Sequence, residues 1–518
     1  MRILPAEEVR RLDQRTIEEL GIPAEILMDT AGRAIADLLS ERLGPGVGRS
    51  AVVLAGVGNN GGDGLVVARV MAGRGWQVRL VLAGDPSKMT GETRLHYQAA
   101  LRFPECLGAI TVQTMHAEPS SSELQELRDR LERAVAIVDA LAGTGLRGPL
   151  REPLLTLAAL LDGHHQALVV AADIPSGLCA TTGQILGAAV HCDVVVAMAA
   201  LKPGLALGHG PELYRELRVA DIGIPPAWLA EAGPGGEWID AELVRPWLPP
   251  RQDHGHKGNF GNLLAVAGSR GKSGAALLAC EAALRVGTAL VTLGVAEPPG
   301  QPLAAHLEGR LPDAMVQAAN PQSLPGLLER KSAAMAGPGM GTGAEALQVL
   351  AQVLTDFPGP LLLDADALTL LAAHPRLAAA AQGRLVLTPH PGEMARLLAL
   401  SVAAVESDRL AAARQLAERF QAVVVLKGHR TLVVAPGGRW AICNQPNAAL
   451  ARGGTGDVLA GAIGGLLAQG MAPFEAATLG VWLHSRAGAA LRRNFGSRSG
   501  LAAELGPLLG VALQELES

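Results

Sequence analysis

The stretch NAALARGGTGDVLAG, residues 447–461, decides how the second half of the chain folds. The glycine-rich turn 453–456 comes directly before Asp457, and the pattern after it turns apolar and helical. Glycines expose backbone N–H groups, and a helix that starts there adds its own free N–H groups and the positive end of its dipole. The stretch therefore predicts an anion site. Because a carboxylate repels bound phosphate, Asp457 is expected to act as a base or to hold magnesium.

A second glycine-rich turn, GVGNNGGDG at residues 56–64, lies near the N-terminus. It follows the apolar run 51–56, which reads as a buried strand, and a helix is expected from about Gly64 to Arg74. The spacing differs from the G-x-G-x-x-G dinucleotide fingerprint. The amides of Asn59 and Asn60 can hold a polar ligand or a cation, although an Asx-rich turn that only caps a helix is the alternative. Two such turns of different build suggest two chemistries.

Composition narrows the class of protein. A chain of 518 residues allows two to four domains, and 49% hydrophobic against 18% charged residues predicts a large core. A net charge of −5 and 3% aromatic residues speak against nucleic-acid binding. The five cysteines form no C-x-x-C pair, so neither a zinc site nor a disulfide framework is expected. The early charges and the lack of a long apolar run predict a cytoplasmic protein without a signal peptide or membrane span.

Apolar runs alternate with helical patterns in both halves, which is typical of parallel α/β sheets. A composition break rich in glycine and proline, within residues 231–250, predicts a boundary between two α/β domains, at 1–230 and 237–518. The expected strands are 51–56, 77–83, 109–114, 135–139, 167–172 and 192–198 in the first half, and 262–268, 289–295, 332–336, 360–364, 384–388 and 422–427 in the second.

Polar residues follow two further strands of the first half. Asp139 stands where strand 135–139 stops, and Asp173 and Ser176 follow strand 167–172. A lone Asp after a strand is usually a turn residue or a helix cap. Ligands bind at the carboxyl ends of parallel strands, however, so these two ends and the turn at 56–64 are expected to share one crevice.

Four motifs in order, NNGGDG, DALAGTGLRGPL, DIPSGL-ATTG and KPG, span most of residues 50–205 and resemble the NAD(P)H-hydrate epimerase family. The resemblance implies a Rossmann-like α/β sandwich, with Asp173 as the proton-transfer base. It implies a potassium ion held by Asn60, Asp139 and Ser176. It also implies substrate contacts at Asn59, Asn60, Gly61, Gly62, Asp63, Gly143, Thr144, Gly145, Leu146, Arg147, Gly148, Pro149 and Asp173.

The second half carries HKGNFGN (256–262), AGPGMG (336–341), LDADAL (363–368), LTPHPGE (387–393) and KGHRT (427–431) ahead of the turn at 453–456. In this order they resemble the ribokinase-like, ADP- or ATP-dependent NAD(P)H-hydrate dehydratases. The resemblance implies hydrate contacts at Ala275, Gly339, His390 and Asp457. It implies adenine-nucleotide contacts at Lys427, Gly428, His429, Arg430, Thr431 and Gly456.

The chemistry of dehydration agrees with this resemblance. Phosphoryl transfer makes a hydroxyl into a good leaving group, and phosphate then departs. Asp457 is expected to take the hydroxyl proton while the N–H groups of residues 453–456 hold the phosphoryl group. A helix dipole contributes only about 0.3–1 kcal/mol when exposed, so magnesium is expected as well. His429 and Arg430 stand where the family usually has small residues, which leaves the choice between ADP and ATP open.

Together these patterns predict a homo-oligomeric enzyme that epimerises the R and S hydrates of NADH and NADPH and dehydrates the S form. Two alternatives stay open. One is a small-molecule kinase of hydroxymethyl-pyrimidine or sugar type that uses Asp457 in the same way. The other is a non-catalytic nucleotide-binding or partner-binding module in the first half. His390, taken alone, is more often a structural turn residue than a ligand contact.

Overall fold

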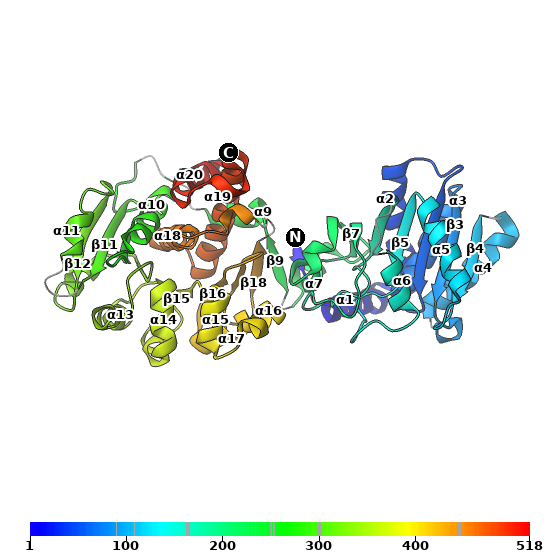
Figure 1. Ribbon diagram of the computed structural model, residues 1–518, viewed down its shortest axis with the longest axis horizontal. Helices are drawn as coiled ribbons and strands as arrows, with labels where there is room; N and C mark the ends of the chain where they lie inside the picture. The colour runs from blue at the N-terminus through cyan, green and yellow to red at the C-terminus, as the bar shows by residue number, and fades with distance from the viewer. Residues whose placement is uncertain are drawn as a thin grey trace. The chain divides into compact units, whose positions relative to one another are not determined.

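The computed structural model describes residues 1–518 except 90, 108, 162–165, 234, 249–250, 252–253, 298–301, 444 and 446. The chain divides into two compact units, Met1–Gly236 and Glu237–Ser518, and both are α/β (Figure 1). None of the helices in the described part of the chain is long and apolar enough to cross a membrane.

The first unit contains a parallel sheet in the order β4-β3-β2-β5-β6-β7-β8. The chain moves outward from β2 in one direction and from β5 in the other. The gap between these two strands is therefore a topological switch point, where open α/β sheets bind ligands. The strands are β2 (Ser50–Gly56), β3 (Gln77–Ala83), β4 (Ile110–Met115), β5 (Ala136–Ala140), β6 (Leu168–Ala172), β7 (Cys192–Met198) and β8 (Tyr214–Ala220).

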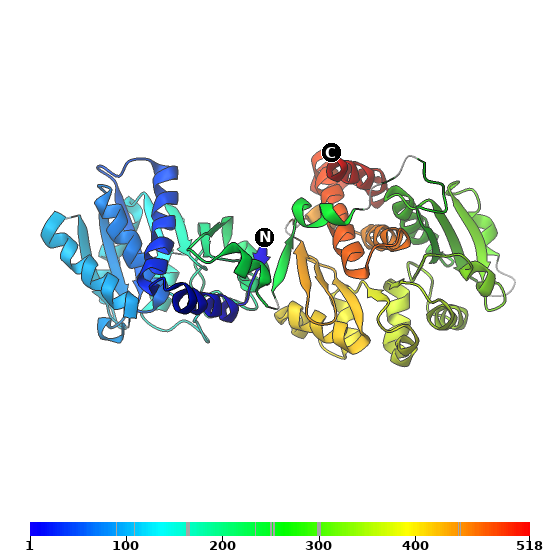
Figure 2. The same ribbon diagram turned by 180° about the vertical axis from the view of Figure 1, so that it is seen from behind.

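Helices cover both faces of this sheet. The helices α2 (Ala24–Leu43) and α3 (Asn59–Gly73) lie on one face, which is toward the viewer in Figure 2. The helices α5 (Ser121–Arg133) and α6 (Leu154–Leu161) lie on the other. The preceding helix α1 (Ala6–Leu20) is amphipathic and buries Val9 and Leu12.

The helix after β2 begins at Asn59, five residues earlier than the predicted start at Gly64. A Cβ on Gly61 would lie 1.8 Å from the carbonyl oxygen of Gly56, and one on Gly62 would lie 2.4 Å from Sδ of Met28. The motif therefore lets the first helical turn press against β2 and α2. Tight packing outweighs the poor helix propensity of glycine, and this is why the predicted start was wrong.

In the second unit the strands follow the order β18-β17-β16-β15-β14-β13-β10-β11-β12. Neighbours from β16 to β12 are parallel, whereas β17 and β18 are antiparallel. The switch point lies between β10 and β13. The strands are β10 (Asn262–Val266), β11 (Leu290–Ala296), β12 (Ala314–Ala319), β13 (Ala333–Ala336), β14 (Leu361–Leu363), β15 (Leu385–Leu387), β16 (Ala422–Leu426), β17 (Leu432–Val434) and β18 (Trp440–Cys443).

On one face of the second sheet, α10 (Ser273–Arg285), α18 (Thr455–Ala468), α19 (Pro473–Ser499) and α20 (Leu505–Glu517) share one apolar core. The helices α13 (Ala344–Asp356), α14 (Ala365–Ala373), α15 (Pro391–Leu398) and α17 (Arg409–Phe420) lie on the other side (Figure 1). A Cβ on Gly461 would lie only 2.0 Å from the carbonyl oxygen of Ala279, so small residues bring α18 and α10 into close contact.

Candidate active sites

A cavity of 660 Å³ opens at the carboxyl ends of β2, β5 and β6, beside the switch point of the first unit. Most of the predicted epimerase residues line it, namely Asn59, Asn60, Gly61, Asp63, Gly143, Thr144, Gly145, Leu146 and Asp173. Gly62, Arg147, Gly148 and Pro149 are not among the lining residues. Gly62 packs against Met28, which itself lines the cavity, and Pro149 lies against Gly187.

Asp173 follows β6 in a left-handed backbone conformation, with φ of 62°. Its Oδ1 accepts hydrogen bonds from the backbone N–H of Met198, at 3.0 Å, and from Nζ of Lys202. Lys202 is 1% exposed and also donates to the carbonyl oxygen of Met198, at 2.7 Å. The left-handed backbone of Asp173 is strained, and strain of this kind persists only where surrounding contacts enforce it, as in many active sites. Lys202 lies within the KPG motif but was not among the predicted site residues.

The three predicted potassium ligands lie around the loop that follows β5. Ser176 donates to Asp139 twice, from Oγ at 2.6 Å and from the backbone N–H at 2.8 Å. The N–H of Ala142 donates to Oγ of Ser176, and a Cβ on Gly143 would lie 3.0 Å from Oδ1 of Asn60. Burial raises the pKa of Asp139 to about 6, against the opposing effect of the Ser176 hydrogen bonds.

These three side chains suit a hard cation, because a carboxylate, a hydroxyl and an amide all offer oxygen donors. Burial of the charge of Asp139 is costly, and a bound cation would offset that cost. The described residues contain no group of three or more His, Cys, Asp or Glu side chains arranged to hold a metal.

The helix α1 forms a wall of the same cavity, which the sequence analysis missed. Arg10, Asp13 and Gln14 line it from this helix. Burial and the nearby Asp173 raise the pKa of Asp13 to about 6, while Lys202 opposes the shift. Burial, Asp173 and Asp13 hold the pKa of Asp63 well above its usual range. The only sequence feature that pointed to this role of α1 was an acid, Asp13, next to the buried Leu12 of an amphipathic helix.

In the second unit, Asp457 lies in the first turn of α18, as the sequence predicted. The turn before it is open at Gly453, where a Cβ would meet nothing within 4 Å. Gly454, with φ of 93°, packs against Leu278 and Ala502. Nζ of Lys427 lies 3.5 Å from a Cβ placed on Gly456. Burial, followed by the nearby Asp364, raises the pKa of Asp457 to about 6, while Lys427 opposes the shift. A carboxyl with this pKa can serve as a base near neutral pH.

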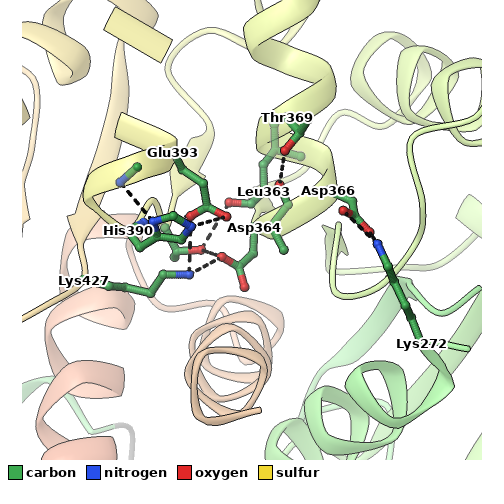
Figure 3. A network of polar contacts seen from close by, with 11 residues as sticks. Lys272, Leu363, Asp364, Asp366, Thr369, His390, Glu393 and Lys427 are labelled. Atoms are coloured by element: carbon green, nitrogen blue, oxygen red, sulfur yellow. Dashed lines mark hydrogen bonds and ion pairs between the residues drawn. The ribbon is translucent and has the colours of Figure 1, made fainter. Parts of the chain in front are cut away.

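Lys427 is held by a network of carboxylates that Figure 3 shows. Its Nζ lies 2.6 Å from Oδ1 of Asp364 and 3.9 Å from Oε2 of Glu393. Oγ1 of Thr388 also donates to Oδ1 of Asp364, at 2.8 Å. Burial lowers the pKa of Lys427, but Asp364 and Glu393 outweigh it, so the net shift is upward and the lysine stays charged. Asp364 and Glu393 lie within the LDADAL and LTPHPGE motifs but were not among the predicted site residues.

His390 caps α15, because its Nδ1 accepts a hydrogen bond from the N–H of Gly392 at 3.0 Å. In return Glu393 accepts from the N–H of His390 at 2.8 Å. The imidazole is 52% exposed and its Nε2 lies 3.5 Å from Oε1 of Glu393. His390 therefore has a structural role as a helix cap, and its exposed ring edge is also accessible to a ligand.

The other predicted hydrate contacts lie at the ends of β10 and β13. A Cβ on Gly339 would lie 2.6 Å from the carbonyl oxygen of Lys272 and 3.2 Å from Cβ of Ala275. Lys272 pairs with Asp366 at 3.0 Å, as Figure 3 shows, and Asp366 accepts from the N–H of Gly341 at 2.9 Å. The fold thus brings Ala275 and Gly339 together.

Arg409 organises the KGHRT turn. The Nη2 atom of Arg409 donates to the carbonyl oxygens of Leu426, at 3.3 Å, and Lys427, at 3.2 Å. Gly428 has φ of 137°, and a Cβ there would lie 2.9 Å from Nη1 of Arg409. Arg430 places its guanidinium 5.0 Å from the ring centroid of Trp238. The Arg430 side chain thus stacks on Trp238. No sequence motif pointed to the role of Arg409.

Comparisons with known proteins match both units. Residues 263–508 match the family model described as NAD(P)H-hydrate dehydratase, and residues 24–204 match the one described as YjeF-related protein N-terminus. A bifunctional NAD(P)H-hydrate repair enzyme from Moorella thermoacetica is 36% identical over 100% of this chain and 97% of its own length. The enzyme of that name from Escherichia coli is 38% identical, covering 96% of this chain and 92% of its own.

A solved ADP/ATP-dependent NAD(P)H-hydrate dehydratase from Bacillus subtilis, co-crystallised with ATP and magnesium, is 30% identical and aligns with a TM-score of 0.47. That match covers 54% of this chain and 98% of the solved one. The curated relatives match along nearly their whole length, and a family model matches within each unit. The chain therefore belongs to the family of bifunctional NAD(P)H-hydrate repair enzymes.

Proposed function

We propose that this chain repairs hydrated NADH and NADPH in two successive steps. The first unit interconverts the R and S hydrates, and the second dehydrates the S form with an adenine nucleotide. Joining both activities in one chain lets the first supply the epimer that the second consumes. The observation that carries the proposal is the placement of Asp457 in the first turn of α18, beside Lys427 and the open turn 453–456.

The dehydration step uses groups that meet at this end of the second sheet. Asp457 removes the proton of the hydrate's hydroxyl as that oxygen attacks the terminal phosphoryl group of the nucleotide. The N–H groups of residues 453–456 stabilise the charge that develops on the phosphoryl oxygens. Phosphate then leaves the ring carbon, the neighbouring carbon loses a proton, and the ring recovers its double bond. Lys427, held by Asp364, would contact the nucleotide phosphates together with the rest of the turn 427–431.

A magnesium ion fits this site. Asp364, Asp366, Glu393 and Asp457 share it with two lysines, which leaves an excess of negative charge before the nucleotide arrives. Magnesium is commonly held by one or two carboxylates together with substrate phosphates. Glu393, 3.9 Å from Lys427, would hold the ion along with the nucleotide. When bound, it would neutralise charge on the transferring phosphoryl group.

In the first unit, Asp173 would move the proton that inversion of the hydroxyl-bearing carbon requires, and Lys202 would keep that carboxylate oriented. Potassium would lie among Asn60, Asp139 and Ser176, where it would neutralise Asp139 and fix the loop 141–143 that borders the cavity. The four predicted contacts outside the cavity lining, Gly62, Arg147, Gly148 and Pro149, would act by shaping the loops. The expected homo-oligomer and cytoplasmic location stay predictions, which light scattering and fractionation would check.

A test follows absorbance at 340 nm, the reduced-nicotinamide band, with a mixed-epimer hydrate of NADH, magnesium and either ADP or ATP. We expect wild type to recover both epimers fully and the Asp457→Asn variant to recover neither. The Asp356→Asn variant, which alters an exposed acid at the end of α13, is the matched control. Recovery that stops at the fraction of one epimer would disprove the activity of the first unit. A stable phosphorylated product would instead support the small-molecule kinase.

A further inference from the structure

We propose that Asp13, on α1, is the second acid–base residue of the epimerase cavity and works opposite Asp173. This inference rests on the proposed epimerase activity and adds a catalytic residue to it. Asp13 lines the cavity together with Asp173 and Lys202, although 160 residues of sequence separate the two aspartates. The two carboxyl groups come from different elements, a helix and a strand end, and both border the space in which a ring would bind.

The hydrogen bonding of Asp13 indicates a ligand. Its Oδ1 is shielded from solvent and has no hydrogen-bond partner among the described residues. A buried carboxyl oxygen without a partner is costly, and native structures usually retain such a group where a ligand or a proton completes it. The Nδ2 atom of Asn60, which lines the same cavity, is likewise buried and without a partner in the described part of the chain. Two incomplete polar groups therefore border one cavity.

Asp13 and Asp173 differ in their surroundings. Asp173 accepts hydrogen bonds from Nζ of Lys202 and from the N–H of Met198, whereas Oδ1 of Asp13 has no partner among the described residues. The charged side chains that line the cavity around Asp13 are Arg10, Asp63, Glu92, Asp173 and Lys202. Burial and the nearby Asp173 raise the pKa of Asp13 to about 6, while Lys202 opposes the shift, so the protonated form of Asp13 is accessible near neutral pH. Two carboxyl groups in such different environments are suited to act as acid and base.

The chemistry of the substrate needs such a pair. Hydration of an enamine places the hydroxyl on the carbon bonded to nitrogen, so this C–O bond can break with help from the nitrogen lone pair. Asp13 gives its proton to the hydroxyl oxygen, the C–O bond breaks, and water leaves with the bonding electrons. The nitrogen lone pair forms a C=N bond. Water then adds to the other face, the C=N electrons return to nitrogen, and Asp173 accepts the proton that the added water loses.

The reverse reaction uses the same groups in exchanged roles, as microscopic reversibility requires. A proton that passes from Asp173 to Asp13 through solvent restores the starting state, and no net acid or base is consumed.

The test uses the full chain without adenine nucleotide, so that dehydration does not occur. One pure epimer is supplied, and the appearance of the other is followed by chromatography. We expect Asp13→Asn to lower kcat for epimerisation by about 10²-fold or more with little change in KM. Asp13→Glu keeps the acid and should recover part of that loss. Glu7→Gln, which alters an exposed acid on the same helix, should match wild type.

Several outcomes would overturn the inference. Asp13→Asn could epimerise at the wild-type rate, could change only KM, or could fall no further than Asp13→Glu, and each result removes Asp13 as a proton donor. Thermal unfolding of the first unit checks that the variants are folded. Epimerisation by wild type in H₂¹⁸O should place ¹⁸O in the product, and its absence would also contradict the scheme. If wild type itself does not epimerise, the proposed function fails instead.

Discussion

The two glycine-rich turns of this chain look alike in sequence, but their glycines differ in what they contact. In the first, 56–64, added Cβ atoms on Gly61 and Gly62 would collide with backbone and with Met28. In the second, 453–456, a Cβ on Gly454 would lie 2.8 Å from Cβ of Ala502, whereas one on Gly453 would meet nothing and one on Gly456 would approach only Lys427. Gly61 and Gly62 therefore bring protein against protein, whereas Gly453 and Gly456 leave open space at a helix N-terminus.

The comparison shows that a run of glycines indicates close approach without saying what approaches. Both turns follow a strand or loop and open a helix, and both lie near a topological switch point. In the first unit Asn59, Asn60 and Asp63, near the start of α3, line the cavity. In the second unit the backbone at Gly453 faces open space.

The largest effect that tests this comparison is expected from Gly61→Ala. The new Cβ would lie 1.8 Å from the carbonyl oxygen of Gly56, which cannot move without shifting β2. We expect a loss of about 4 kcal/mol or more in the stability of the first unit, with dehydration of the S hydrate retained. Gly58→Ala is the control, because a Cβ there meets nothing and φ is −93°. Equal thermal unfolding temperatures of the two variants would show that Gly61 is not required for close packing in the first turn.

A smaller loss is expected from Lys427→Met. The change would leave the carboxylate of Asp364, which is 1% exposed, without its cation. Breaking a buried pair in this way costs about 3 kcal/mol, and the KM for the nucleotide should rise as well. Lys272→Met is the control for stability, since its partner Asp366 is more exposed and that pair should contribute below about 1 kcal/mol. Denaturant unfolding of the second unit distinguishes the two, and an equal loss would contradict the network in Figure 3.

Dehydration should also depend on pH through Asp457. The base must be ionised, and its pKa is raised to about 6 by burial and by Asp364. Below that pH we expect kcat/KM to fall about tenfold for each further pH unit, because the protonated carboxyl cannot accept a proton. Above it the rate should level off. A pH–rate profile of wild type with the S hydrate measures this, and a profile that is flat down to pH 4 would remove Asp457 as the base.

The smallest structural effect is expected from Gly453→Ala. No atom lies within 4 Å of the added Cβ, so stability should change by less than about 0.5 kcal/mol. If the nucleotide's phosphoryl group fills that space, the KM for nucleotide should nevertheless rise. Thermal unfolding and nucleotide titration together separate the two effects. An unchanged KM would mean that the phosphoryl group lies elsewhere and would weaken the contrast between the turns.

Sequence reasoning found most of the parallel strands, because buried strands read as apolar runs without any tertiary information. It missed β8 and β12, whose residues are largely half-buried or exposed, so that their apolar character is diluted. It also missed the short antiparallel strands β17 and β18. The second of these depends on pairing with β17 more than on any pattern of its own.

The sequence by itself determined the two-unit α/β organisation, the two glycine-rich turns and the position of Asp457 in the first turn of a helix. Each of these follows from local periodicity or from the conformational freedom of glycine. Only the tertiary structure decided that Asp13 borders the same cavity as Asp173 and that Arg409 holds the turn at Lys427. The residues of each pair are distant in sequence and belong to no common motif, and only the order of strands in the folded sheet brings them together.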